Sequence, residues 1–207
     1  MESPLREGGR QPGLRLIETL LWDGAAFPHL PLHQARLQDG AAALGWPAPP
    51  DLAPTVAGTA PARAARVRLT LDCAGAVTCE VGPLPQPIRE WRLGPAPERL
   101  RSTDPWLGVK STHRAAYDRA RATLPPGLDE VIFLNERGEV CDGTITTLFF
   151  DRGAGLRTPP LTAGLLPGVL RRALSAPEET LVAPDLPQVR LWVGNALRGL
   201  IPARWIG

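Results

Sequence analysis

Polar and apolar residues alternate along several short stretches of the chain, the pattern of β-strands that bury one face. This alternation predicts strands over three stretches: 14–22, 66–72 and 77–81. The last two flank the turn residues 73–75 and indicate a hairpin, and the turn signal at 23–24 predicts a return strand over 27–30. A linker over 82–87 precedes a further candidate strand over 88–93.

A helical repeat of apolar residues follows the first predicted strand. Leu37, Ala41 and Leu44 form an apolar stripe that predicts a helix over 32–44, which ends at Gly45 and Pro47. The Pro- and Ala-rich residues 47–61 fit either a short helix or a loop.

The second half of the chain has shorter periodic segments. Its patterns predict helices over 112–124 and 167–174, a hairpin of strands 130–135 and 139–141, a buried strand over 145–150 and a short strand over 189–193. We therefore expect an α+β fold of two α/β domains, a smaller N-terminal domain over 1–86 and a larger C-terminal domain over 87–207.

Composition excludes several classes of protein. The chain is 43% hydrophobic, which suffices for a packed core, and its net charge of +2 argues against a nucleic-acid-binding protein. No stretch reaches the roughly 18 apolar residues of a membrane span, and the polar residues 1–12 resemble neither a signal nor a transit peptide. Cys73, Cys79 and Cys141 lack metal-ligand spacing, so we expect no metal and a reducing, cytoplasmic setting.

One residue stands out in the composition, because Lys110 is the only lysine among 23 basic residues. Arginine is not deprotonated in proteins, whereas a lysine whose pKa is lowered becomes a neutral amine nucleophile. Lys110 precedes the predicted helix over 112–124, whose dipole would favour the neutral amine. A codon bias that leaves one exposed loop lysine by accident explains the count equally well.

Four other positions are candidates for a site. Asp142 ends a predicted hairpin and could face the ring nitrogen of a cofactor, or simply serve the turn. The Gly-rich segment 162–170 could present backbone N–H groups to an anion, although it also fits an ordinary helix start. Arg36, with His33 three residues before it on the same helix face, could bind a phosphate or lie in solvent, and Asn195 fits an ordinary turn.

Taken in order, these segments resemble the class IV aminotransferase family, which are fold-type IV enzymes that use pyridoxal 5'-phosphate (PLP). The resemblance covers roughly residues 14–203 and rests on six motifs: Leu16-Ile17-Glu18-Thr19-Leu20, His33-Gln34-Ala35-Arg36-Leu37, Lys110 through Arg114 and Tyr117, Asp129-Glu130-Val131 through Asp142-Gly143-Thr144, Thr158-Pro159 with Gly164-Leu165-Leu166-Pro167-Gly168, and Gly194-Asn195-Ala196-Leu197-Arg198-Gly199. Within the family, the first and last motifs are most similar to aminodeoxychorismate lyases.

The resemblance implies a role for each matching residue. Lys110 would form the Schiff base with PLP and shuttle the proton, and Asp142 would lie at the pyridine nitrogen. The phosphate would be bound by one arginine side chain and by four backbone positions: Arg36, Val169, Leu170, Asn195 and Ala196. The chain departs from the family by having Asp142 where Glu is usual and Thr147 where Asn is frequent, and we expect much of the usual N-terminal strand to be missing.

Three functions follow as alternatives from this resemblance. The first is a lyase that converts 4-amino-4-deoxychorismate to 4-aminobenzoate and pyruvate in folate biosynthesis. The second is an amino-acid aminotransferase acting on branched-chain or D-amino acids, and the third is a non-catalytic relative. The resemblance also implies a small-molecule amine substrate, a homodimer, and an aminodeoxychorismate synthase as pathway neighbour.

Overall fold

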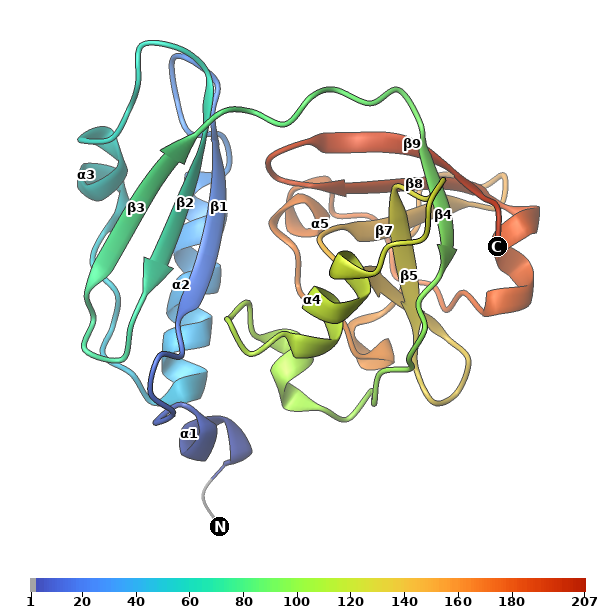
Figure 1. The fold of residues 1–207 in the computed structure, drawn as a ribbon, viewed down its shortest axis with the longest axis horizontal. Coiled ribbons are helices and arrows are strands. Elements are labelled where there is room, and N and C mark those ends of the chain that lie inside the picture. The colour runs from blue at the N-terminus through green and yellow to red at the C-terminus, as the bar shows by residue number, and fades with distance from the viewer. Residues whose placement is uncertain (1–2) are drawn as a thin grey trace. The chain divides into compact units, whose positions relative to one another are not determined.

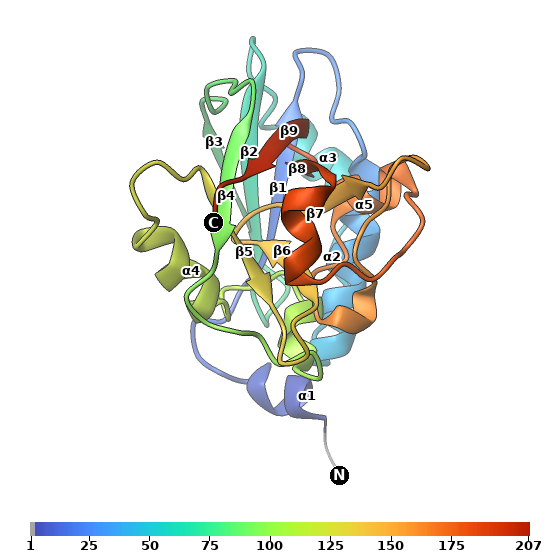
Figure 2. The same ribbon diagram turned by 90° about the vertical axis from the view of Figure 1, so that its right-hand side faces the viewer.

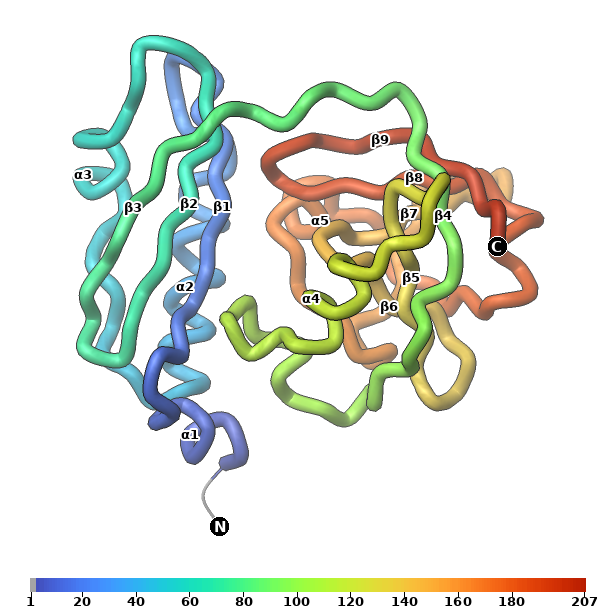
Figure 3. Tube along the Cα trace, viewed as in Figure 1, coloured from blue at the N-terminus to red at the C-terminus, as the bar shows by residue number. Residues whose placement is uncertain are grey.

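The computed structural model describes residues 3–207, so residues 1–2 of the polar N-terminal stretch lie outside the described part. The chain divides into two compact units. Unit 1 comprises Met1–Gln86 and Val109–His113, and unit 2 comprises Pro87–Gly108 and Arg114–Gly207. The path of the chain through these segments can be followed in Figure 3.

Unit 1 is built on a three-stranded antiparallel sheet in the order β1-β2-β3 (Figure 1). The strands are β1 (Leu16–Trp22), β2 (Ala65–Leu71) and β3 (Val77–Gly82). Alternate residues of β2 are buried, and its buried positions lie opposite Leu16, Glu18 and Leu20 of β1. One face of the sheet is therefore apolar except for Glu18.

The helices of unit 1 are α1 (Pro4–Gly8), α2 (Leu30–Leu44) and α3 (Leu52–Ala57), and both α1 and α3 contact α2. The helix α2 packs against β1, and its buried face carries Leu37, Ala41 and Leu44 together with His33 and Arg36. A Cβ atom at Gly40 would lie 3.1 Å from Leu16 Cδ2, which shows how closely α2 approaches the strand.

Unit 2 contains a six-stranded mixed sheet in the order β6-β5-β4-β9-β8-β7 (Figures 1 and 2). Its strands are β4 (Trp91–Pro95), β5 (Glu130–Leu134), β6 (Val140–Gly143), β7 (Thr147–Asp151), β8 (Arg190–Asn195) and β9 (Gly199–Trp205). β4 pairs in parallel with both β5 and β9, and the other pairs are antiparallel. The edge strands β6 and β7 are joined by residues 144–146 alone, so the sheet must curl until its two edges meet at this end.

The sheet of unit 2 has an apolar cluster on each face. One cluster contains residues from all six strands, among them Trp91, Phe150 and Val193. The other packs Phe133 and Cys141 against α4 (Ala115–Ala122) and the loop near Leu165. The short helix α5 (Val169–Leu174) contacts β8. Every helix in residues 3–207 is too short or too polar to cross a membrane.

Most of the predicted elements are present, with shifted ends. The strand over 14–22, the helix over 32–44 and both hairpins are confirmed, and the 47–61 segment holds the short helix α3. The return strand over 27–30 is wrong, because Pro28 lacks an N–H and His29, at φ 61°, starts α2 instead. The strand β9 was not predicted, since Pro202 interrupts its pattern.

The segment around Lys110 differs from the predicted domain division. Residues 109–113 group with unit 1 and not with the remainder of 87–207, because their backbone is hydrogen-bonded to the start of β1. The helix α4 consequently begins at Ala115 and not at Thr112, five residues after Lys110. Lys110 therefore does not directly precede the helix, as the argument from the helix dipole assumed.

Candidate functional site

The backbone of the Lys110 segment runs along the free edge of β1 in unit 1. Ile17 N–H donates to Lys110 O at 2.8 Å, and Leu16 forms an antiparallel bridge with Ser111. Thr112 N–H donates to Arg15 O at 2.8 Å, and Arg15 N–H donates to Thr112 Oγ1 at 3.0 Å. The only lysine is thus attached to the strand whose sequence begins the family resemblance.

Glu18, which follows Ile17 in β1, binds the side chain of Arg36. Arg36 Nε donates to Glu18 Oε1 at 2.8 Å and Arg36 Nη2 donates to Glu18 Oε2 at 2.6 Å, a bidentate pair. His33 Nδ1 also lies 2.6 Å from Glu18 Oε2. The helical spacing of three residues between His33 and Arg36 therefore brings both side chains to one carboxylate.

These three side chains are buried, so the interpretation of Arg36 as a solvated arginine is excluded. Glu18, His33 and Arg36 are 1%, 0% and 7% exposed. Burial raises the pKa of Glu18, but the charge and hydrogen bonds of Arg36 and the contact with His33 outweigh it and lower that pKa to about 2. Glu18 is accordingly an ionised carboxylate within the core of unit 1.

In unit 2, Asp142 is held at the end of β6. Tyr117 from α4 donates its hydroxyl hydrogen to Asp142 Oδ1 at 3.3 Å, and Leu166 N–H donates to Oδ2 at 3.2 Å. Burial and the charge of Asp142 raise the pKa of Tyr117, which keeps its hydroxyl a donor. Each carboxylate oxygen has two lone pairs, so a carboxylate held in this way can accept more than two hydrogen bonds.

A second buried carboxylate fixes the loop that follows Asp142. Glu130, 0% exposed, accepts hydrogen bonds from the hydroxyls of Thr144 at 2.6 Å and Thr146 at 3.1 Å. Gly143 leaves no room for a side chain beside it, since a Cβ there would lie 2.5 Å from Thr146 Oγ1 and 2.8 Å from Glu130 Cγ. The loop that joins the two sheet edges is therefore rigidly supported.

The segments predicted to surround a phosphate are neighbours in unit 2. A Cβ at Gly168 would lie 2.6 Å from Thr147 Oγ1, and one at Gly194 would lie 2.6 Å from Leu170 Cδ2. No described residue accepts a hydrogen bond from the backbone N–H of Val169 or Leu170, the first two residues of α5. These N–H groups remain available as donors.

The turn between β8 and β9 is organised by the Asn195 side chain. Its Nδ2 donates to Ile145 O at 3.1 Å, and its Oδ1 accepts from Leu197 N–H at 3.1 Å and Arg198 N–H at 3.0 Å. The N–H of Ala196 donates to no described residue. Asn195 thus positions the turn through its side chain, and any ligand contact falls to the backbone.

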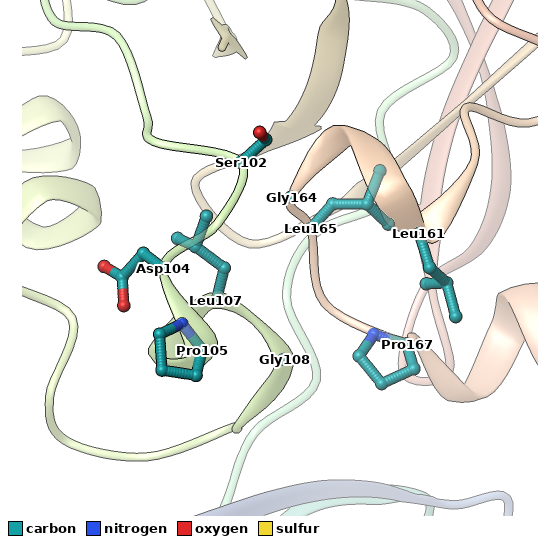
Figure 4. Close-up of a pocket in the computed structure, with 9 residues that line it drawn as sticks. All are labelled: Ser102, Asp104, Pro105, Leu107, Gly108, Leu161, Gly164, Leu165 and Pro167. Carbon is teal, nitrogen blue, oxygen red and sulfur yellow. The ribbon is translucent and has the colours of Figure 1, made fainter. Parts of the chain in front are cut away.

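A cavity of about 220 Å³ lies in unit 2 between the loops 102–108 and 161–167 (Figure 4). Its lining includes Leu107, Leu161 and Leu165 together with Ser102 and Asp104. It is smaller than the roughly 300–1,000 Å³ of typical ligand sites, and none of the predicted cofactor residues lines it. We assign no ligand to this cavity.

The structure gathers the predicted residues into two groups. Lys110 and Arg36 are both attached to β1 in unit 1. The others belong to unit 2, at the end of β6, the start of α5 and the end of β8 with the turn after it: Asp142, Val169, Leu170, Asn195 and Ala196. Sequence reasoning gave no role to Glu18. A signal was present, because Glu18 lies between Leu16 and Leu20 on the core-facing positions of an alternating strand, where an ionised group needs a partner.

The chain is similar to known proteins over nearly its whole length. The profile of a family described as "Amino-transferase class IV" matches residues 15–206. A provisionally named aminodeoxychorismate lyase of Schizosaccharomyces pombe is 34% identical over 177 residues, 77% of this chain and 72% of that protein. A provisionally named amino-acid aminotransferase of Mesorhizobium loti is 40% identical, with a TM-score of 0.87, over 93% of this chain and 100% of that one. A 4-amino-4-deoxychorismate lyase of Pseudomonas aeruginosa shares the fold at 24% identity, with a TM-score of 0.80, over 99% of this chain and 87% of that one.

Proposed function

Since the chain belongs to the class IV aminotransferase family of PLP-dependent enzymes, we propose that it is a 4-amino-4-deoxychorismate lyase. The observation that carries the proposal is that two consecutive residues of β1 hold Lys110 and Arg36. Ile17 and Glu18, within the motif most similar to aminodeoxychorismate lyases, anchor the backbone of Lys110 and the guanidinium of Arg36. The 34% identity to the Schizosaccharomyces pombe relative supports the same reaction.

The residues present fit PLP. Arg36 has five N–H donors and gives two to Glu18, which leaves three for a phosphate. Further donors for the phosphate would come from the N–H groups of Val169, Leu170 and Ala196. Asp142 would accept a hydrogen bond from the ring nitrogen, and Lys110 would hold the cofactor covalently. PLP itself supplies an electron sink for the negative charge that develops on the substrate carbon.

The side chains of this chain would then handle the proton and the ring charge. We assign to Lys110 Nζ the removal of the proton from the ring carbon that bears the amine. Asp142, fixed by Tyr117 and Leu166 N–H, would keep the ring nitrogen protonated. Breaking the bond from the neighbouring ring carbon to the enolpyruvyl oxygen makes the substrate ring aromatic. The products 4-aminobenzoate and pyruvate together contain every atom of the substrate.

An amino-acid aminotransferase is the second candidate, favoured by the 40% identity to the Mesorhizobium loti protein. It would use Lys110 and Asp142 for the same initial proton removal. It differs in its requirement for an acceptor, because the amino group of the first substrate must be passed on to a keto acid before a second turnover.

The two candidates are separated by supplying one substrate at a time. With 4-amino-4-deoxychorismate and no keto acid, the lyase releases equal amounts of 4-aminobenzoate and pyruvate over many turnovers. Lys110→Arg is the control, because arginine keeps the charge but cannot be deprotonated, and it should release neither product. Consumption of an amino acid in an amount equal to that of the enzyme, with no 4-aminobenzoate formed, would reject the lyase.

We further propose that the enzyme acts as a homodimer in folate biosynthesis. An aminodeoxychorismate synthase would be its pathway neighbour, because such an enzyme supplies the proposed substrate.

A further inference from the structure

We infer that Glu18 is a positioning residue for the phosphate of the cofactor, acting through Arg36. The inference rests on the proposed function, in which Arg36 binds that phosphate. Glu18 grips one edge of the guanidinium, through Nε and Nη2, at 2.8 and 2.6 Å. Because a guanidinium is planar and rigid, gripping one edge fixes the direction in which its remaining donors point.

Glu18 itself cannot touch a ligand. Its side chain is 1% exposed and that of Arg36 is 8% exposed, so only the arginine presents any surface. The second N–H of Nη2 and both N–H groups of Nη1 make no hydrogen bond to a described residue. The ion pair therefore has a closed side, towards Glu18, and a side that carries unused donors.

His33 restrains the carboxylate from another direction. Glu18 is ionised and only accepts hydrogen bonds, so the hydrogen lies on His33 Nδ1, 2.6 Å from Glu18 Oε2. The other ring nitrogen, Nε2, is buried and has no hydrogen-bond partner among the described residues. Within residues 3–207, the contact with Glu18 is thus the only hydrogen bond of this ring, and it connects the carboxylate to the same helix that carries Arg36.

A role in positioning and a role through charge predict opposite results. Glu18 places a negative charge beside the arginine that would bind a dianionic phosphate, so charge alone opposes phosphate binding. If charge were decisive, Glu18→Gln would strengthen phosphate binding. If Glu18 positions the guanidinium, the same substitution weakens phosphate binding. An arginine that has lost its bidentate pair with Glu18 adopts several rotamers, and the ligand must order it again.

The test compares pyridoxamine 5'-phosphate with pyridoxamine, measured by calorimetric titration of the cofactor-free protein. Neither probe has an aldehyde, so neither needs Lys110. The dissociation constant of pyridoxamine divided by that of pyridoxamine 5'-phosphate is a ratio that reports the phosphate contribution alone. We expect Glu18→Gln to reduce this ratio by at least about tenfold, the size of one lost charge-assisted contact. Arg36→Met should reduce it further, and the double variant should equal Arg36→Met.

A matched control removes a buried carboxylate elsewhere. Asp151→Asn in unit 2 also removes the charge of a buried carboxylate, which is 8% exposed, pairs with Arg190 and lies at the other end of β7 from Thr147, and it should lower stability without changing the ratio. Glu18→Asp, which keeps the charge but shortens the reach, decides the question if Glu18→Gln does not fold. Positioning predicts a reduced ratio for Glu18→Asp, and charge alone predicts no change.

An unchanged or increased ratio in either variant overturns the inference. So does a wild-type protein that binds both probes equally, because Arg36 then holds no phosphate. Failure of the proposed reaction is a separate result, since it would appear as absent 4-aminobenzoate in a protein whose ratio still depends on Glu18.

Discussion

Replacing Glu18 with Gln should remove part of the acid sensitivity of the folded protein. Glu18 is buried, yet Arg36 and His33 hold its pKa at about 2, below the ordinary value of 4.5. A carboxylate whose pKa is lower in the folded than in the unfolded state stabilises the fold above the unfolded pKa. That contribution is lost as the pH falls from about 4.5 towards 2.

The size of the effect follows from the two pKa values. A difference of 4.5 minus about 2 corresponds to about 3 kcal/mol of unfolding free energy at neutral pH. Integration of the proton linkage places about 2 kcal/mol of this loss between pH 6 and pH 3. Several exposed carboxylates also titrate in this range, so only the difference between wild type and variant isolates Glu18.

The measurement is urea unfolding of the cofactor-free protein, followed by tryptophan fluorescence at pH 6 and pH 3. The unfolding free energy of the wild type should fall by about 2 kcal/mol more than that of Glu18→Gln. The double variant Glu18→Gln/Arg36→Met removes both charges and serves as the control for a buried, unpaired arginine. Equal losses in wild type and both variants would refute the argument that Glu18 is ionised and paired in the folded state.

Four further outcomes are expected. Borohydride reduction of the protein with PLP should leave an adduct on the Lys110 peptide in mass spectrometry, and its absence would end the PLP assignment. Asp142→Asn should slow turnover by roughly 10²-fold, the typical cost of one electrostatic partner at the reacting centre, whereas Tyr117→Phe, which removes a hydrogen bond to the same carboxylate, should retain most activity. Gly143→Ala should destabilise the protein by about 1–3 kcal/mol through overpacking against Glu130, but Gly108→Ala, whose Cβ meets nothing within 4 Å, should unfold as the wild type does. Light scattering should give a dimer, and a fully active monomer would contradict the proposed assembly.

Local patterns located much of the fold. Alternation identified β1, the β2–β3 hairpin and the β5–β6 hairpin, and the apolar stripe of Leu37, Ala41 and Leu44 identified α2. These elements are encoded by the periods of strands and helices, which are visible within ten to fifteen residues. Two segments that contain a proline were predicted wrongly. The segment around Pro28 was predicted as a strand but precedes a helix, and the segment around Pro202 was not predicted as a strand but pairs with β8, with Pro202 opposite Trp192.

The order and types of the residues were enough to show which side chains are available for chemistry. The single lysine, the arginine three residues after His33, and the motif order sufficed to identify the family, because residue types and their spacing survive in the linear chain. Sequence alone could not separate the lyase from the aminotransferase, since both need the same proton removal.

Which of these residues contact one another became visible only in the folded chain. The pairing of Lys110 with β1 joins positions more than 90 residues apart, and the Glu18–Arg36 pair joins a strand to a helix. Such contacts depend on how α2 packs on the sheet and on which strand lies at the edge of the sheet. Neither can be inferred from a short stretch of sequence. Burial showed that Glu18 has a role, because a carboxylate removed from water stays ionised only when packing places charged or hydrogen-bonding partners beside it.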